Sequence, residues 1–136
     1  MNSHATNPKP TGLAGVVAGT TAISTVGKEG SGLTYRGYKI EDLAENARFE
    51  EVAWLLLHND LPTQTELTEF EARLTSQSGL PAALMETLES IPGTANPMDV
   101  MRTGCSMLGC LEPEGDFKRG EAVAERLLAV LPSVLL

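Results

Sequence analysis

The chain has 136 residues and a net charge of −8 at pH 7, and 42% of its residues are hydrophobic but only 4% aromatic. This is the length of one ordinary domain with room for a sizeable core, which must be built mainly from aliphatic side chains. The acidic balance, without any run of Lys and Arg, excludes binding to a nucleic-acid backbone and disfavours docking on an anionic membrane.

The beginning of the chain is not expected to be a secretory signal. Residues 1–11 lack a basic start followed by an apolar run, so they are predicted to be a polar, disordered tail. The sequence has no run of about 18 apolar residues, as a transmembrane helix would need. We therefore expect a cytoplasmic protein with no membrane partner.

A small β-hairpin is predicted after this tail. Residues 12–27 hold Val, Ile and Thr side chains that favour extended structure, interrupted by glycines. The glycines at 27–32 form a turn cluster, and residues 33–38 alternate enough to pair back as a second strand. Because such a hairpin is marginal alone, it is expected to pack on helices.

The rest of the chain has the patterning of helices joined by short loops. Thr63 and Glu66 match a capping box at one helix start, and Asn96 followed by Pro97 matches another. Gly79 is expected to end the helix that Thr63 opens. Helices are predicted at 40–47, 49–60, 64–77, 80–91, from 97 to about 108, and at 121–136.

Apolar side chains predict how two of these helices pack. The helix at 49–60 presents one face made of Phe49, Val52, Ala53, Leu56 and Leu57, and Leu55 widens this face. The last helix ends in an apolar stretch without Gly, a basic cap or a polar tail. This favours a truncated chain over a natural C-terminal helix docked in its own domain. The side chains expected to await a partner are Leu131, Val134, Leu135 and Leu136.

The two cysteines do not predict a metal site or a disulfide. Cys105 and Cys110 are five positions apart, which places them about 140° from each other around a helix. That spacing suits neither a pair of metal ligands nor a disulfide. We expect two buried thiols in a reducing cytosol.

Residue types and spacings reveal no catalytic constellation, so no catalytic, cofactor-binding or metal-ligating residue is predicted. His4 lies in the tail, and His58 closes a predicted helix, where a capping or surface role is expected. The glycines at 27–32 do not form a nucleotide-binding motif. In the segment YRGY at 35–38, Arg36 could bind an anionic ligand, but pairing with a nearby acid is the favoured interpretation.

Longer strings of the sequence resemble a known family. The segment GLAGVVAGTTAISTVGKEGSGLTYRGYKIEDLAENARFEEVAWLLLHNDLPT resembles the amino-terminal part of the citrate synthase family. Within it TAISTVG and LTYRGYKIEDLA, and further along NPMDVMRTG, are most similar to the 2-methylcitrate synthase branch. The resemblance runs from about Gly12 to Leu136 and is specific, because long strings match in order with matching gaps.

The resemblance implies an all-α fold, the large-domain portion of a citrate synthase, with a small N-terminal β-hairpin. Residues 12–136 would then be an incomplete, N-terminal part of the helical large domain. The family is dimeric and joins an acyl-CoA to oxaloacetate without a metal or other cofactor; propionyl-CoA gives 2-methylcitrate and acetyl-CoA gives citrate. Its catalytic histidines and aspartate lie downstream of the segment that resembles residues 121–136, so none of them maps to this chain.

Two functions are compatible with these observations. The first is an N-terminal portion of a 2-methylcitrate or citrate synthase, inactive alone, whose partners are the remainder of the synthase, a homodimer partner and the substrates. The alternative is a non-catalytic, small helical interaction module derived from the same fold, which pairs through its apolar last helix.

Overall fold

The computed structural model of the chain describes residues 12, 16–27 and 32–136. The predicted tail at 1–11 and the middle of the predicted glycine turn, residues 28–31, lie outside the described residues. The elements are β1 (Ser24–Val26), β2 (Leu33–Tyr35), β3 (Tyr38–Lys39), α1 (Ile40–Asn46), α2 (Phe49–His58), α3 (Gln64–Ser76), α4 (Ala82–Glu89), α5 (Pro97–Leu111), the 3₁₀ turn η1 (Phe117–Arg119) and α6 (Gly120–Leu135).

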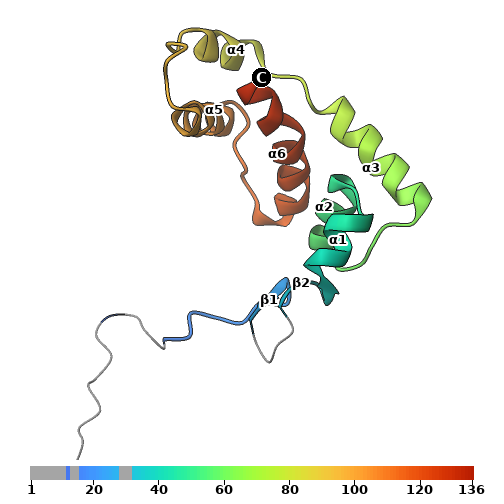
Figure 1. Ribbon diagram of the computed structural model, residues 1–136. Helices are drawn as coiled ribbons and strands as arrows, with labels where there is room; N and C mark the ends of the chain where they lie inside the picture. The colour runs from blue at the N-terminus through green and yellow to red at the C-terminus, as the bar shows by residue number, and fades with distance from the viewer. Residues whose placement is uncertain (1–11, 13–15, 28–31) are drawn as a thin grey trace, which may run out of the picture.

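The architecture is helical with a small sheet at one end, as predicted. In Figure 1 the sheet lies beside α1, and α2 leads through α3 to the group formed by α4, α5 and α6. The most extensive contacts between α-helices are those of α2 with α3, α3 with α6, α4 with α5 and α5 with α6. Among the described residues, no helix combines the length and apolarity needed to cross a membrane.

The predicted hairpin is present, but its strands are shorter and a third strand follows. β1 pairs antiparallel with β2, and β2 with β3, with Tyr35 opposite Tyr38 in the second pair. Arg36 and Gly37 connect these strands, and both have positive φ, +49° and +92°. A two-residue turn with positive φ at both positions matches the right-handed twist of a hairpin. The extra strand was missed because Arg seldom adopts this conformation.

The Arg36 side chain in this turn reaches the C-terminal end of α2. The prediction that it pairs with an acid is therefore wrong. Its Nη2 donates a hydrogen bond of 2.9 Å to the carbonyl of Leu56, one of the carbonyls left unpaired in the last turn of a helix. The Tyr38 hydroxyl donates to Asp60, just after α2, at 3.1 Å. The sheet is therefore fastened to the C-terminal end of α2.

The predicted helix starts at Thr63 and Asn96 are confirmed. The Glu66 N–H donates to Thr63 Oγ1 at 3.3 Å, while the Thr63 N–H donates to Glu66 Oε2 at 2.8 Å. The hydroxyl and N–H of Thr63 also hold the pKa of Glu66 below its ordinary value. Asn96 accepts from the Met98 N–H at 2.9 Å, with Pro97 in the first turn of α5.

Two helix ends differ from prediction. α3 stops at Ser76 and its C-cap is Gln77, so Gly79 is not its terminator. The helix predicted at 80–91 would place Pro81 in its first turn, but Pro81 is the N-cap of α4, which begins at Ala82. A left-handed C-cap does occur, at Asn59 after α2, with φ of +77°. Asn tolerates this conformation nearly as well as Gly, and both serve at helix ends.

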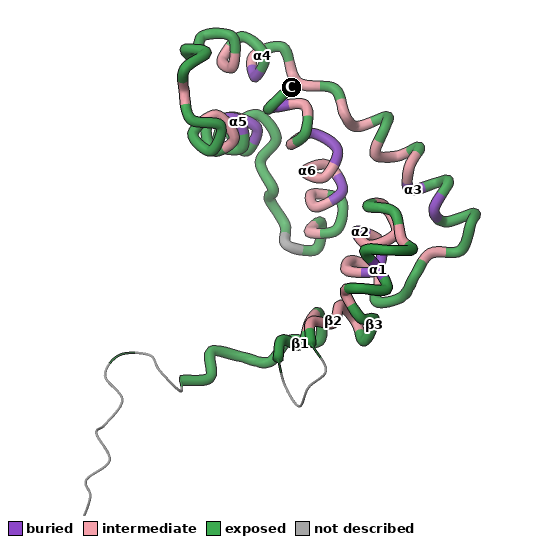
Figure 2. The backbone as a smooth tube through the Cα atoms, in the orientation of Figure 1, coloured by how far each residue is buried: buried purple, intermediate pink, exposed green. Residues whose placement is uncertain are grey.

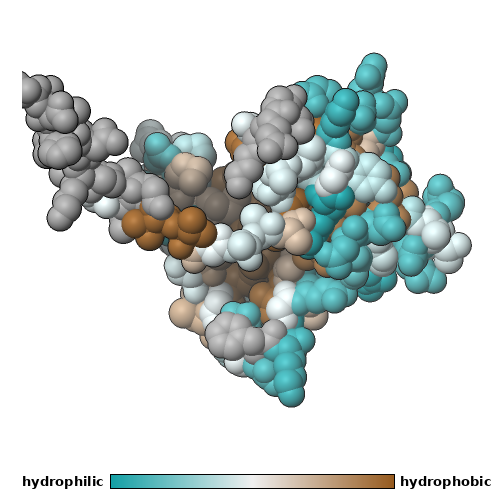
Figure 3. All heavy atoms as spheres, turned by 90° about the horizontal axis from the view of Figure 1, so that it is seen from below, coloured by the Kyte–Doolittle hydropathy of each residue, from teal (hydrophilic) through white to brown (hydrophobic). Residues whose placement is uncertain are grey.

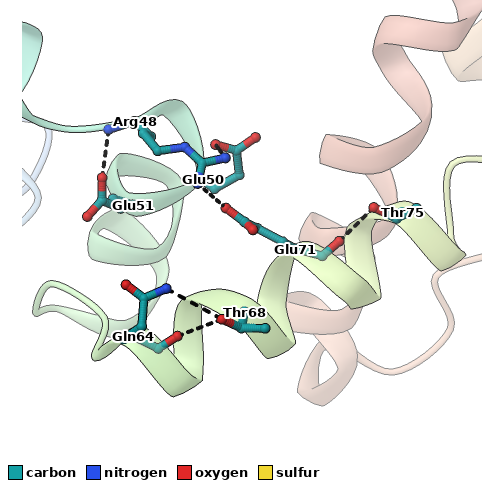
Figure 4. A network of polar contacts seen from close by, with 7 residues as sticks. All are labelled: Arg48, Glu50, Glu51, Gln64, Thr68, Glu71 and Thr75. Carbon is teal, nitrogen blue, oxygen red and sulfur yellow. Dashed lines mark hydrogen bonds and ion pairs between the residues drawn. The ribbon is translucent and has the colours of Figure 1, made fainter.

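An ion pair joins the start of α2 to α3. Arg48 precedes α2, and its backbone N–H donates to Glu51 Oε2 at 2.8 Å, while its Nη1 lies 2.7 Å from Glu71 Oε1 of α3 (Figure 4). Because Arg48 is well exposed, this pair contributes little to stability.

The core includes a cluster between the last three α-helices, and the face predicted for α2 is confirmed except at Phe49. One cluster, between α4, α5 and α6, contains Leu84, Leu108, Val130 and Val134. On α2 the buried residues are Ala53 and Leu55, whereas Phe49 is 64% exposed. Val52, Leu56 and Leu57 are half-buried. Ala53 and Leu55 lie about 160° apart around the helix, so α2 is covered on more than one side, and α3, which buries Leu67 and Phe70, is one of its neighbours.

Some of the apolar side chains at the end of α6 are packed within the chain, and others are exposed. Val134 is buried against Gly104 of α5, so the prediction that it awaits a partner is wrong. Leu131 is half-buried, while Leu135 and Leu136 are exposed.

Figure 2 shows buried residues along the sides of α5 and α6. Figure 3 shows hydrophobic side chains in the recessed middle of the face seen from below.

The prediction that both thiols are buried is also wrong. Cys105 and Cys110 are free and exposed. The buried side of α5 carries Gly104 and Leu108, and at about 100° per residue Cys105 is turned a quarter of the way round from Gly104. Cys110 lies on nearly the opposite side from Leu108 by the same count.

Thr63→Ala is expected to lower the free energy of unfolding by about 1 kcal/mol, because α3 loses the side-chain acceptor at its first turn. Urea denaturation measures this change. Thr68→Ala is the matched control, since the Thr68 hydroxyl donates only to the Gln64 carbonyl within the same exposed helix. Its effect should stay within about 0.5 kcal/mol, and equal losses in the two variants would contradict a capping role for Thr63.

Candidate functional site

A cavity of about 590 Å³ lies between the C-terminal half of α5 and the first half of α6. Its apolar part comes from the facing sides of these two helices, and its polar part from the loop between them and from the segment after α3. The lining residues are Gln77, Cys105, Leu108, Gly109, Glu112, Pro113, Glu114, Arg119, Ala122, Val123, Arg126 and Leu127.

Arg126 dominates the polar wall of this cavity. Its Nε and Nη2 donate to the two carboxylate oxygens of Glu112, the C-cap of α5, at 2.9 and 2.7 Å. Its Nη1 donates to the backbone carbonyls of Gln77 and, at 3.1 Å, Gly79, both in the connection that follows α3. One planar side chain of α6 thus joins three separate parts of the chain, which suits the fixed fork of a guanidinium.

The charges of this pair are mutually stabilised. The hydrogen bonds from Arg126 hold the pKa of the Glu112 carboxyl below its ordinary value, against a smaller opposing effect of burial. The same hydrogen bonds raise the pKa of Arg126. Because Arg126 is already bonded to a carboxylate and two carbonyls, it is not available to hold an anionic substrate. The cavity therefore has an apolar floor without a charge aimed into it from Arg126.

The lining residues of the cavity, which also include the cation of Arg119, do not by themselves make up a catalytic constellation. No histidine lines it, and Cys105 is its thiol, without a lining base to activate it. Its acids are Glu112, which is engaged by Arg126, and Glu114 in the exposed loop. Chemically, this cavity suits the packing of apolar side chains better than a reaction.

A second cluster surrounds His58, for which a capping or surface role was predicted; it lies in the last turn of α2, as capping requires, but it is half-buried and not on the surface. His58 ends α2 as predicted, but only 23% of its side chain is exposed. Its ring lies against Trp54, with ring centroids 3.8 Å apart. Its Nε2 is 3.8 Å from Glu121 Oε1 at the start of α6.

Glu125, one turn further along α6, completes this cluster together with Arg73 of α3. Its side chain is 9% exposed, and it accepts hydrogen bonds from Arg73 Nε at 3.1 Å and Nη2 at 3.0 Å. These bonds raise the pKa of Arg73. Sequence reasoning missed the cluster because its members are far apart in the chain; the available signal was an acid within the apolar stretch AVAERLLAVL.

The sequence and the fold are both similar to known proteins. The family model described as citrate synthase, C-terminal domain, matches residues 12–136. The 2-methylcitrate synthase of Shewanella oneidensis is 59% identical over 124 residues, which are 91% of this chain and 33% of that protein. The 2-methylcitrate synthase 2 of Corynebacterium glutamicum is 46% identical over 138 residues, covering 99% of this chain and 36% of that one.

Solved structures agree with these relatives. The citrate synthase of Thermotoga maritima superposes with a TM-score of 0.76 at 30% identity, covering 92% of this chain and 32% of that one. The complex of carboxymethyl coenzyme A and oxaloacetate with the citrate synthase of Thermoplasma acidophilum gives 0.80 at 20% identity, covering 88% and 32%. The chain thus spans about a third of the length of the relatives that it matches. It belongs to the citrate synthase family.

Proposed function

We propose that this chain is the N-terminal portion of a 2-methylcitrate synthase. The whole enzyme would be a cytoplasmic homodimer that condenses propionyl-CoA with oxaloacetate, forms 2-methylcitrate and releases CoA, as a step of propionate breakdown. The observation that supports this proposal is the 59% identity to the Shewanella oneidensis enzyme across 91% of the chain. The alternative substrate is acetyl-CoA, which would give citrate; a relative from Mycolicibacterium smegmatis with 43% identity bears the name citrate synthase.

The role of this portion would be structural. Removing a proton next to a thioester carbonyl needs a positioned base, and the oxygen that gains charge needs a hydrogen-bond donor. That no residue of this chain is catalytic remains a prediction, and the contacts of the two arginines described above support it. Arg126 and Arg73 are each bound to a carboxylate of the same chain, so neither is free to hold a substrate carboxylate.

A chimera tests the proposed function. Residues 12–136 replace the matching segment of the Shewanella oneidensis 2-methylcitrate synthase, and CoA release is followed with a thiol reagent in the presence of propionyl-CoA and oxaloacetate. We expect a folded chimera with most of the parent's kcat and with the parent's preference for propionyl-CoA over acetyl-CoA. A folded but inactive chimera would contradict the assignment.

The 136-residue chain alone is expected to release no CoA from either acyl-CoA, because the catalytic groups would lie in the rest of the synthase. The measurement is the same thiol assay at high protein concentration, with the parent Shewanella enzyme as the positive control. Turnover by the pure chain that survives a further purification step would refute this expectation.

The alternative, a non-catalytic interaction module, draws support from the exposed Leu135 and Leu136 beside the half-buried Leu131. Contiguous apolar surface of this kind marks an interface or an aggregation liability. A module should melt cooperatively as a defined small oligomer in light scattering. Broad unfolding with polydisperse particles and binding of a hydrophobic dye would support a portion of a larger enzyme.

A further inference from the structure

Three potential metal ligands converge where the end of α2 meets the start of α6. The Nε2 of His58 and carboxylate oxygens of Glu121 and Glu125 all lie within 4.8 Å of one another. Glu121 and Glu125 are four residues apart on one helix, so they project from the same side of α6. An imidazole and two carboxylates are a donor set that divalent transition metals accept.

The imidazole has an unmet bonding requirement. His58 Nε2 is buried and has no hydrogen-bond partner among the described residues. Its distance to Glu121 Oε1, 3.8 Å, is too long for a hydrogen bond. The stacked ring of Trp54 limits how far the imidazole can turn. A buried nitrogen without a partner is unfavourable, and a bound cation would satisfy it.

Glu125 is held as a metal-ligating carboxylate usually is. Both of its oxygens accept a hydrogen bond from Arg73, and each keeps a further lone pair that points elsewhere. Arg73 is itself packed on the Phe70 ring, 5.6 Å from the centroid. Carboxylate ligands oriented by a second hydrogen-bonding group are typical of protein metal sites.

The geometry needs only a small adjustment. Donor atoms around a tetrahedral zinc ion, at about 2.1 Å from the metal, are about 3.4 Å apart. Closing the present separations requires movement of roughly 1 Å, and Glu121 can supply it because 63% of its side chain is exposed. The same exposure gives a route of entry and space for a water ligand. The two carboxylates and Arg73 leave one net negative charge to attract a cation.

We propose that His58, Glu121 and Glu125 form a binding site for a zinc-type divalent metal ion, with water completing the coordination. The ion would fasten α2 to α6 next to the contact between Arg73 and Glu125. The site is independent of the proposed synthase activity, since the reaction does not use it. Its consequence is that metal binding stabilises the packing of these helices.

Zinc titration of the whole 136-residue chain tests this site. Every protein carries Cys105→Ser and Cys110→Ser, because these exposed thiols would also bind zinc. Competition with a chromophoric chelator should give one Zn²⁺ per chain. Trp54 is the single tryptophan of the sequence and stacks on His58, so its fluorescence should change as the site fills. Zn²⁺ should also raise the Tm.

The variants are chosen to keep the fold. His58→Phe retains an aromatic ring against Trp54 but removes the ligand, and it should weaken binding by about 100-fold or more. Glu121→Gln changes an exposed side chain and should weaken binding by about 10-fold or more. Circular dichroism checks that both remain helical. His4→Gln removes the other histidine of the sequence, Glu114→Gln alters a loop acid, and neither should change the affinity.

Three results would overturn the proposal. One is the absence of stoichiometric Zn²⁺ binding to the parent. Another is binding that is lost in His4→Gln but kept in His58→Phe, which would place the metal elsewhere. The third is an affinity that Glu121→Gln leaves unchanged, because His58 and Glu121 would then be no more than an ion pair when the histidine is protonated.

Discussion

Gly104→Ala is expected to lower the free energy of unfolding by about 1 to 3 kcal/mol, the usual effect of overpacking a core. A Cβ at this position would lie 2.5 Å from Cγ1 and 3.3 Å from Cγ2 of Val134. Val134 cannot easily withdraw, because it is buried and a valine in a helix is almost restricted to one rotamer. Instead α5 and α6 would have to separate. Urea denaturation monitored by circular dichroism measures the loss.

The matched control lies five residues further along the same helix. Nothing approaches a Cβ at Gly109 within 4 Å, so Gly109→Ala should raise stability by about 0.5 to 1 kcal/mol through helix propensity alone. Opposite signs for two identical substitutions on one helix isolate the close approach at Gly104. In the double variant Gly104→Ala/Val134→Ala the loss should be less than the sum of the single losses. Stabilisation by Gly104→Ala would contradict this packing.

Local signals predicted the helix starts well. The capping box of Thr63 and Glu66 and the Asn96-Pro97 start involve neighbours in sequence, so the residues that make the bonds can be read together. The turn at Arg36 and Gly37 was missed because only its glycine signals positive φ. The same limit applies to helix ends, where Asn59 acts as the left-handed cap and Gly79 does not.

Contacts between helices that are distant in the chain could not be predicted from the sequence pattern. The sequence does not show that Gly104 must lack a side chain, because the close approach of Val134 from α6 appears only in the folded structure. The two acids that form a cluster with His58, Glu121 and Glu125, are far from it in sequence, and α6 places them beside it. Phe49 is exposed although Ala53, one turn further along the same face of α2, is buried, so helical periodicity alone did not show where that face stops being covered. Family resemblance predicted the fold class correctly, but these side-chain clusters required the folded structure.

Arg126→Met is expected to lower the free energy of unfolding by about 2 to 3 kcal/mol at pH 7, since charge-assisted hydrogen bonds are lost and their acceptors are left behind. Met keeps much of the volume of the side chain. The hydrogen bonds lost are those that Arg126 donates to the carboxylate of Glu112 and to the backbone carbonyls of Gln77 and Gly79. Arg102→Met is the control, because its pair with Asp99 lies on an exposed helix surface and should contribute less than about 0.5 kcal/mol. Urea denaturation of both variants gives the comparison.

The pH dependence of the stability loss in Arg126→Met distinguishes the carboxylate acceptor from the carbonyl acceptors. Because Arg126 lowers the pKa of Glu112 in the folded state, the Glu112 contribution is present above the ordinary glutamate pKa of about 4.3. It is lost as the pH falls through the lower folded pKa. The carbonyls of Gln77 and Gly79 do not titrate, so part of the effect of Arg126→Met should remain at low pH. An effect that is the same at pH 7 and well below pH 4 would mean that Arg126 joins α6 to the connection after α3 through the carbonyls alone.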